Sequence, residues 1–247
     1  MTVKLSQFIN RQPFSGLLAG KAAAGRKLPA VILLLICYFF GIFADYYAMD
    51  FTQFIPSTPL EILQAAALLA GLVFMVLQVL QHKWMWYFNL ATSAASLAVT
   101  LMSSLWASAA LNAYFIVMSV IGIFSWKKLA QKDEGRDRLR LVRPTSRMLV
   151  ISILAAAVLC VGIWQVLLAA KDASPFLDSL TLILSALATW WLTRSYKEQW
   201  YVWIVADTIA LAMYVSQGLW GMAALFFFYV ISSVIGLVHW QKKGTYV

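Results

Sequence analysis

Long apolar runs of about twenty residues, separated by short polar segments, dominate this sequence. The runs lie at 28–48, 60–81, 84–103, 106–126, 148–170, 175–194, 198–216 and 219–240. The hydrocarbon core of a bilayer needs about 20 consecutive apolar residues in a helix that crosses it. The pattern therefore predicts an all-α integral membrane protein with eight transmembrane helices.

The polar segments divide the chain into a few parts. Residues 1–27 form a basic N-terminal segment, expected in the cytoplasm, and the run 28–48 is too long for the apolar part of a signal peptide. We therefore expect 28–48 to be a retained transmembrane helix. The only long internal loop in the predicted scheme is the basic stretch 127–147, which precedes the run 148–170.

The distribution of charge predicts the orientation of the helices. If the N-terminus lies in the cytoplasm and the chain crosses eight times, 18 of the 19 lysines and arginines fall on the cytoplasmic side. Only Lys171 falls outside. Membrane proteins concentrate basic residues in cytoplasmic loops. We therefore expect both termini, as well as loop 127–147, to be cytoplasmic.

The sequence also contains an internal repeat. A shift of 114 positions aligns residues 79–128 with 193–242 without a gap, and 16 of the 50 pairs are identical. The matched residues include tryptophan, lysine and glycine, which the apolar composition does not explain. Two three-helix units, 60–126 and 175–240, are thus joined by the single helix 148–170. Three helices carry the chain to the opposite side of the membrane, and the single linking helix brings it back. Both units therefore enter the membrane in the same direction, so the sequence predicts parallel repeats. The architecture is one extra helix followed by a 3+1+3 arrangement.

Composition narrows the possible functions. The chain is 62% hydrophobic and 12% charged, whereas soluble domains are about half apolar and a quarter charged. Its net charge of +9 is concentrated in short segments, which indicates orientation and contact with anionic lipid and gives no reason to expect nucleic acid. The motifs HExxH, CxxC and GxxxxGK[ST] are missing, so we expect no metal, no cofactor and no ATPase activity.

One apolar run carries an unusual set of polar and aromatic residues. At about 100° per residue, Trp200, Trp203, Asp207 and Tyr214 fall on one helix face, and Gln217 follows at the end of the run. A carboxylate near the middle of a membrane costs a few kcal/mol, so Asp207 should face protein or a water-filled cavity. Aromatic rings beside a carboxylate suit a flat cationic ligand. The alternatives are an interfacial role for the tryptophans and a structural hydrogen bond for Asp207.

Positions at which the repeats differ provide further candidates. Asn89 aligns with Trp203, and Asn112 aligns with Phe226. A cavity between the units would thus be chemically asymmetric, although both amides could equally form hydrogen bonds between helices. Trp190 is a further candidate, but its place near the end of its run favours an interfacial role.

These residues resemble those of a known family. The segment Thr189-Trp190-Trp191, followed by Lys197, Glu198, Trp200-x-x-Trp203, Asp207 and Tyr214, is similar to the PnuC family of bacterial nicotinamide riboside transporters. The similarity covers roughly 60–242. PnuC proteins in turn resemble full-length SWEET sugar transporters, with the same 3+1+3 plan. Many members have seven spans, and the run 28–48 departs from that plan.

The resemblance implies facilitated diffusion of nicotinamide riboside across the bacterial inner membrane, trapping of the product by a cytoplasmic riboside kinase, and a homotrimer. The helix face, the differences between the repeats and the resemblance together give these expected ligand-binding residues: Trp203, Asp207, Trp200, Asn89, Asn112, Tyr214, Gln217 and Trp190. Transport of another small aromatic nucleoside or vitamin, coupling to protons, and a membrane subunit that transports nothing remain alternatives. A membrane enzyme would need a cluster of His, Asp or Glu near one interface, and the acidic residues here are scattered.

Overall fold

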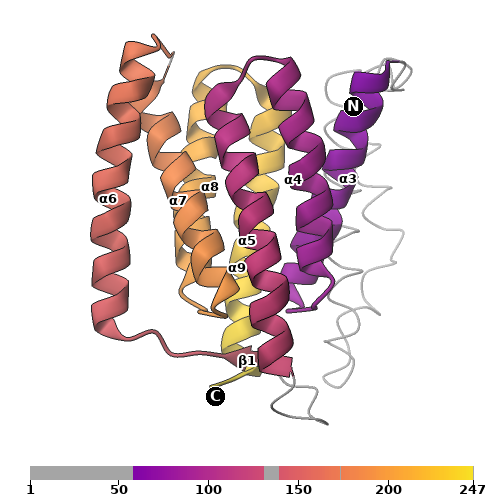
Figure 1. Ribbon diagram of the computed structural model, residues 1–247, viewed down its shortest axis with the longest axis vertical. Helices are drawn as coiled ribbons and strands as arrows, with labels where there is room; N and C mark the ends of the chain where they lie inside the picture. Colours follow the sequence, from indigo (N-terminus) through magenta and orange to yellow (C-terminus); the bar gives the residue numbers. More distant parts are fainter. Residues whose placement is uncertain (1–57, 131–138, 173, 247) are drawn as a thin grey trace, which may run out of the picture. The chain divides into compact units, whose positions relative to one another are not determined.

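The computed structural model describes residues 58–130, 139–172 and 174–246. Over these residues the chain forms seven long helices, and the extra span expected at 28–48, like the segment 1–27, lies outside them. The helices, labelled as in Figure 1, are α3 (Pro59–Val79), α4 (Met85–Met102), α5 (Trp106–Ala130), α6 (Ser146–Ala169), α7 (Pro175–Thr193), α8 (Gln199–Ser216) and α9 (Trp220–Lys243). The predicted helical character of the chain is confirmed over these residues, and the count of eight spans stays a prediction.

Local sequence signals explain where the helices begin and end. Thr58 and Glu61 form a reciprocal cap at the start of α3, with Pro59 in its first turn. The turns after α3 and α7 each pass through a left-handed residue, Gln81 and Ser195, with φ of 52° and 56°. These two positions are 114 residues apart. The turns therefore repeat along with the sequence.

Length and composition make five of the described helices, α3, α5, α6, α7 and α9, suitable for crossing a membrane. The outer surface supports the same conclusion, because large apolar side chains of α6 such as Val158 and Val166 are 72% and 66% exposed. Soluble proteins rarely expose continuous apolar surface of this kind. The two helices outside this group, α4 and α8, are 18 residues long and carry many of the polar candidate residues.

Six of the helices follow one another in a closed ring. The order of packing is α3, α4, α5, α7, α8, α9 and back to α3, while α6 packs mainly on α7 from outside (Figure 1). Buried hydrogen bonds close the ring between its halves. Gln78 donates to Gln199 at 3.1 Å, and the Trp240 indole donates to the Val79 carbonyl at 3.0 Å. On the other side, the Tyr114 hydroxyl donates to the Ala186 carbonyl at 2.9 Å.

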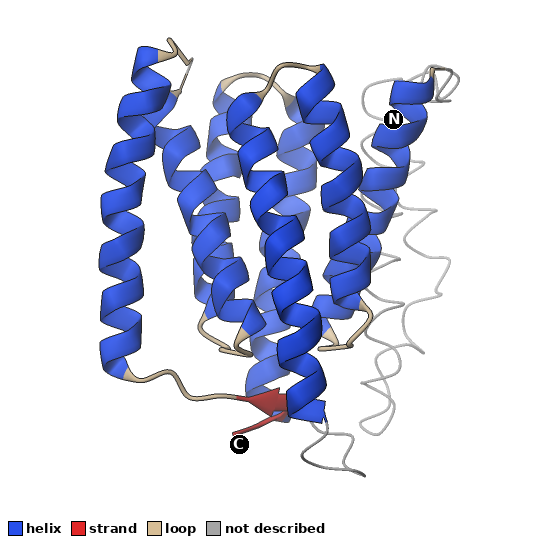
Figure 2. Cartoon of the chain, viewed as in Figure 1, coloured by secondary structure: helices blue, strands red, loops and turns tan. Residues whose placement is uncertain are grey.

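A short β-pair corrects the expectation of a purely helical chain. β1 (Leu139–Leu141) pairs in parallel with β2 (Gly244–Tyr246) at the end of the bundle that carries the C-terminus (Figure 2). The Gln81 side chain fixes β1, because it donates to the Arg140 carbonyl and accepts from the Arg140 amide at 2.7 and 2.8 Å. The segment 127–147 is therefore not all loop, since α5 continues to Ala130 and β1 follows.

Candidate functional site

The buried carboxylate of Asp207 lies between α8 and α9. Its side chain is only 4% exposed, and the Ser233 hydroxyl of α9 donates to Oδ2 at 3.1 Å. Tyr229, one turn before Ser233, interacts electrostatically with Asp207. The lysines and arginines of the described helices lie at the helix ends, so no basic residue of this part of the chain stands beside Asp207 along α8. A charged carboxylate at this depth therefore has no basic partner along its own helix, and a cationic ligand would supply one.

Trp203 lies one turn before Asp207 on the same helix. It is half-buried, and its indole Nε1–H is buried without an acceptor among the described residues. Buried donors are nearly always paired with protein or water, and a missing partner calls for an explanation. A ligand that binds beside Asp207 would supply both an aromatic partner for the ring and an acceptor for this N–H.

Trp200, by contrast, fills the space between two helices. It is 2% exposed, its ring covers Gly236 of α9, and it meets Trp240 edge-on at 5.5 Å between ring centroids. The first half of the chain has the same arrangement, in which Trp86 covers Gly122 and meets Trp126 at 5.6 Å. Both pairs are T-shaped, at 86°. The structure thus places Trp200 in the packing between α8 and α9, and its role in ligand binding stays a prediction.

Asn89 is buried in the corresponding interface of the first half. Its side chain is 6% exposed, and its amide donates to the Ser119 hydroxyl at 2.9 Å. Ser119 corresponds to Ser233 in the repeat. The two serines therefore both bind a polar group on the neighbouring helix, but that group is an amide in one half and the Asp207 carboxylate in the other.

The remaining four candidates make contacts with groups other than Asp207. Asn112 donates to the Ser108 carbonyl of its own helix at 2.9 Å. Tyr214 stacks on Phe226, with ring centroids 5.2 Å apart.

Gln217 is exposed just beyond the end of α8, with its amide 3.5 Å from the Ser174 hydroxyl. Trp190 is near the end of α7, where the Arg194 guanidinium lies 4.5 Å from its ring centroid. Trp190 and Gln217 thus mark opposite ends of the helices.

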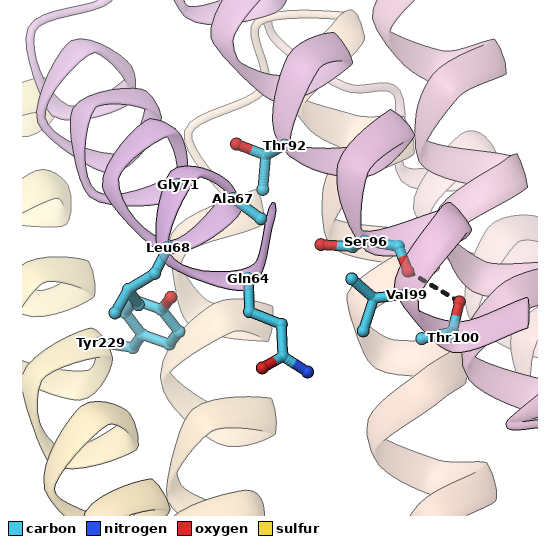
Figure 3. Close-up of a pocket in the computed structure, with 9 residues that line it drawn as sticks. All are labelled: Gln64, Ala67, Leu68, Gly71, Thr92, Ser96, Val99, Thr100 and Tyr229. Carbon is cyan, nitrogen blue, oxygen red and sulfur yellow. Dashed lines mark hydrogen bonds between the residues drawn. The ribbon is translucent and has the colours of Figure 1, made fainter. Parts of the chain in front are cut away.

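A cavity of about 280 Å³ opens where α3, α4 and α9 meet (Figure 3). Its polar lining consists of Gln64, Thr92, Ser96, Thr100 and Tyr229, and Figure 3 shows the Gln64 amide extending into the space between the helices. The Thr92 hydroxyl is buried without a partner in the described residues, whereas Thr100 donates to the Ser96 carbonyl at 2.8 Å. Tyr229 of this lining lies one turn before Ser233, the hydrogen-bond partner of Asp207, on α9.

The polar lining of the cavity is only partly repeated in the ring. In the repeat alignment, Ala206 and Ala210 of α8 replace Thr92 and Ser96 of α4. Phe115 likewise replaces Tyr229. Thr92, Ser96 and Tyr229 therefore have apolar counterparts, whereas Thr100 and Gln64 correspond to the polar residues Tyr214 and Asp178.

Comparison with known proteins identifies the family. The family model described as nicotinamide mononucleotide transporter matches residues 61–242. The chain belongs to this family of transporters. The nicotinamide riboside transporter PnuC of Escherichia coli (strain K12) is 24% identical over 201 residues, which cover 71% of this chain and 82% of that protein. PnuC of Haemophilus influenzae is 25% identical over 128 residues, covering 52% of this chain and 56% of the relative.

A solved structure supports the fold of this family member. The crystal structure of the vitamin B3 transporter PnuC superposes with a TM-score of 0.62 at 22% identity, covering 91% of this chain and 97% of that chain. The resemblance to the PnuC family seen in the sequence is therefore confirmed. At this level of identity the structural match establishes the fold and not the role of any side chain.

The residues that sequence reasoning missed in this family member are the hydroxyl groups of the cavity. Thr92, Ser96 and Thr100 recur every four residues and so share one face of α4. That spacing was available in the sequence. Small polar residues are common in membrane helices, however, where they serve close packing, and the contribution of Tyr229 from α9 has no signal in the spacing of α4.

Proposed function

We propose that the protein carries nicotinamide riboside, the nucleoside form of vitamin B3, into the cell by facilitated diffusion. The observation that carries the proposal is the pair formed by buried Asp207 and half-buried Trp203, whose indole N–H lacks an acceptor. The names of the relatives from Escherichia coli and Haemophilus influenzae support the same substrate.

The chemistry of the substrate suits these two residues. Nicotinamide riboside has a permanently cationic pyridinium ring with a carboxamide, and a ribose. Stacking of the cation on the Trp203 ring would contribute about 2 kcal/mol in a desolvated site. Asp207 would balance the positive charge, which offsets part of the cost of holding a carboxylate inside the membrane. The free N–H of Trp203 would donate to an oxygen of the substrate.

The riboside is a better substrate for this site than the mononucleotide named in the family description. A mononucleotide adds a phosphate, which proteins hold with arginine, lysine or helix N-termini. In the described helices the basic residues lie near the ends, while a carboxylate occupies the middle of α8. A phosphate beside Asp207 would therefore meet repulsion with no compensating charge.

The cavity between α3, α4 and α9 is the proposed site for the ribose. Its hydroxyl and amide groups both donate and accept, as sugar hydroxyls require. Its volume of about 280 Å³ is just below the lower bound of about 300 Å³ for sites that hold a whole ligand, and the ribose is only part of this one. Tyr229 of the cavity lies one turn before Ser233, which donates to Asp207, so a ligand with a cationic ring beside Asp207 would have its hydroxylated tail directed toward this cavity.

Uptake of labelled nicotinamide riboside into proteoliposomes tests the proposal. We expect Trp203→Ala and Asp207→Asn each to weaken uptake, with Trp203→Ala costing about 1–3 kcal/mol of binding. Thr208→Val is the matched control, because exposed Thr208 binds only the backbone of its own helix in the described contacts. The assignment of the site is falsified if neither variant changes affinity or uptake while the control remains normal.

A neutral analogue of the same shape separates the roles of Asp207. If the carboxylate pairs with the pyridinium, Asp207→Asn will weaken binding of the riboside far more than binding of the analogue. If the carboxylate holds ribose hydroxyls, both ligands will weaken alike. If it is structural, stability will fall while affinity is unchanged. Uptake with and without a pH gradient tests the alternative of proton coupling, and uptake of other aromatic nucleosides and vitamins tests the alternative substrates.

The proposal includes eight spans, two parallel three-helix repeats and both termini in the cytoplasm of a bacterial inner membrane. The matched packing of Trp86 on Gly122 and Trp200 on Gly236 supports the repeat. The matched left-handed residues Gln81 and Ser195 support it further. Reporter fusions at both termini and in segment 131–138 test the orientation, and a periplasmic signal from either terminus would contradict it.

The homotrimer and the cytoplasmic riboside kinase come from the family resemblance alone. The mass of the purified protein in detergent, corrected for bound detergent, tests the trimer. A kinase that phosphorylates the riboside would make uptake effectively one-way without contacting the transporter. Co-expression of such a kinase should raise accumulation of label in cells and leave uptake by proteoliposomes unchanged.

A further inference from the structure

A second cavity, of about 320 Å³, lies far along α4 from the hydroxyl-lined one. It is formed by the start of α4 and the last turns of α5, at the end of the bundle that carries the C-terminus. Two lysines and four aromatic side chains line it: Lys83, Lys127, Trp84, Tyr87, Trp86 and Trp126. The transport site proposed above uses none of these residues.

The cavity carries positive charge without a visible counter-charge. Both ammonium groups, Lys83 and Lys127, belong to exposed residues, and no carboxylate of the described residues lines the cavity. The indole Nε1–H of Trp126 is also buried without an acceptor there. Two cations and one free donor around a single space would suit an anion with several acceptor oxygens.

The repeat provides an internal comparison, because the second half closes the corresponding space with its own groups. Tyr246 of β2 covers Lys197, the counterpart of Lys83, with its ring centroid 5.4 Å from Nζ. Gln241 stands where the first half has Lys127, and its amide donates to the Tyr201 hydroxyl at 3.1 Å. The first half keeps both lysines and has no such cover among the described residues.

The hydrogen bonds of the two tryptophan pairs, Trp86–Trp126 and Trp200–Trp240, also differ between the halves. Trp240 donates its N–H to the Val79 carbonyl at 3.0 Å, whereas its counterpart Trp126 donates to no described acceptor. The Trp86 N–H is unpaired as well, but so is that of its counterpart Trp200. The missing acceptor for the Trp86 N–H is therefore common to both repeats. Only the missing acceptor for the Trp126 N–H distinguishes the first half from the second.

The surroundings of the cavity match those of a lipid headgroup. Trp84 and Tyr87 are 51% and 42% exposed, as expected for aromatic residues at a membrane interface. Beyond the cavity, α5 presents an exposed apolar stripe that includes Phe124, Ile121 and Val117, at 62%, 41% and 53% exposure. These residues recur every three to four positions, so they share one face of the helix. An acyl chain could lie along this stripe while its phosphate occupies the cavity.

We propose that this cavity binds the phosphate headgroup of an anionic phospholipid. Basic pockets between transmembrane helices are a recurring type of site for such headgroups. Each lysine near a charged membrane surface contributes about 1 kcal/mol, which corresponds to about fivefold in affinity. Loss of both Lys83 and Lys127 should therefore weaken binding of the lipid roughly thirtyfold.

The test uses the purified full-length protein in a neutral detergent. Phosphatidylglycerol, phosphatidylcholine and inorganic phosphate are titrated separately, and the bound lipid is counted by native mass spectrometry while the melting temperature is followed. The double variant Lys83→Gln/Lys127→Gln is compared with Lys242→Gln/Lys243→Gln, which removes the same charge from exposed residues at the same end of the bundle. Trp126→Phe removes only the indole donor.

We expect phosphatidylglycerol to bind and stabilise the protein and the Lys242/Lys243 variant. The Lys83/Lys127 variant should lose about thirtyfold in affinity, and Trp126→Phe should show a smaller loss. Equal losses in the two lysine variants would indicate diffuse charge and overturn the site. Equal stabilisation by phosphatidylcholine would also overturn it, and the same shift with inorganic phosphate alone would indicate a free-anion site instead of a lipid site.

Discussion

Replacing Gly236 by alanine should destabilise the protein, because the new methyl group would enter the ring of Trp200. A Cβ built at Gly236 lies 2.6 Å from both Cζ2 and Cζ3 of that ring, and it lies closer still to Cη2. Carbon atoms in contact prefer about 3.5–4.0 Å, so the overlap is about 1 Å. Trp200 is 2% exposed and has Trp240 against it, which leaves little space for adjustment.

The magnitude follows from two opposing terms. Overpacking of a core typically costs about 1–3 kcal/mol, whereas replacing glycine by alanine inside a helix gains about 0.5–1 kcal/mol. The expected net loss is therefore about 1–2 kcal/mol, measured as a fall of a few degrees in the melting temperature of the detergent-solubilised protein. Gly122→Ala, which meets Trp86 in the same way, should fall by a similar amount.

Gly162→Ala is the control for this prediction, because nothing lies within 4 Å of a Cβ at that position on α6. It should leave stability unchanged or slightly higher. The double variant Trp200→Leu/Gly236→Ala should be no less stable than Trp200→Leu alone, since the smaller side chain removes the overlap. Equal stability of Gly236→Ala and Gly162→Ala would refute the packing role of Trp200. A loss of riboside affinity in folded Gly236→Ala would instead support Trp200 as a ligand-binding residue.

Three further changes test other parts of the structure. Thr92→Val removes a buried, unpartnered hydroxyl from the α3–α4–α9 cavity and should weaken riboside binding in calorimetry by about 1 kcal/mol; unchanged affinity would argue against the ribose site. Hydrogen bonding to Tyr246 raises the pKa of Lys197 above its ordinary 10.5, so this contact stabilises the fold at neutral pH and is lost as the pH rises through the raised pKa. The stability advantage of the wild type over Tyr246→Phe, followed by melting temperature against pH, should therefore disappear above pH 10.5. Deletion of 1–48, which removes the segment before both repeats, should leave riboside affinity largely intact in correctly inserted protein, and loss of affinity would assign this segment to the site.

Helix positions could be predicted from the sequence because the bilayer imposes a length on every span. The pattern predicted a run at 175–194, and the structure forms α7 over Pro175–Thr193. β1 and β2 could not be predicted in this way. Each is three residues long, which is too short for a pattern of alternation, and the Gln81 side chain from a distant turn fixes β1.

The candidate site contains residues whose different surroundings could not be predicted from helical periodicity. Trp200 and Asp207 share a face of α8, and the spacing alone treats them alike. The structure separates them because Trp200 meets a glycine on α9, whereas Asp207 meets the Ser233 hydroxyl. The matched glycines of the repeat were visible in the sequence. Their role became clear only from the packing of α9 on α8 and of α5 on α4. Spacing along a single helix does not contain this tertiary information.

Matched and unmatched positions of the two repeats have different surroundings in the ring. Where the repeats agree, as at Trp86 and Trp200, the structure uses the residues to hold helices together. Where they differ, as at Ser93 and Asp207, one half has a small side chain and the other a carboxylate. A ring with identical chemistry in both halves would favour a ligand with two equal ends. The proposed substrate has a cation at one end and hydroxyls at the other, so it can be distinguished only by positions that break the symmetry. Substitutions at matched positions should therefore act mainly on stability, and substitutions at the Asp207 position mainly on which molecule is carried.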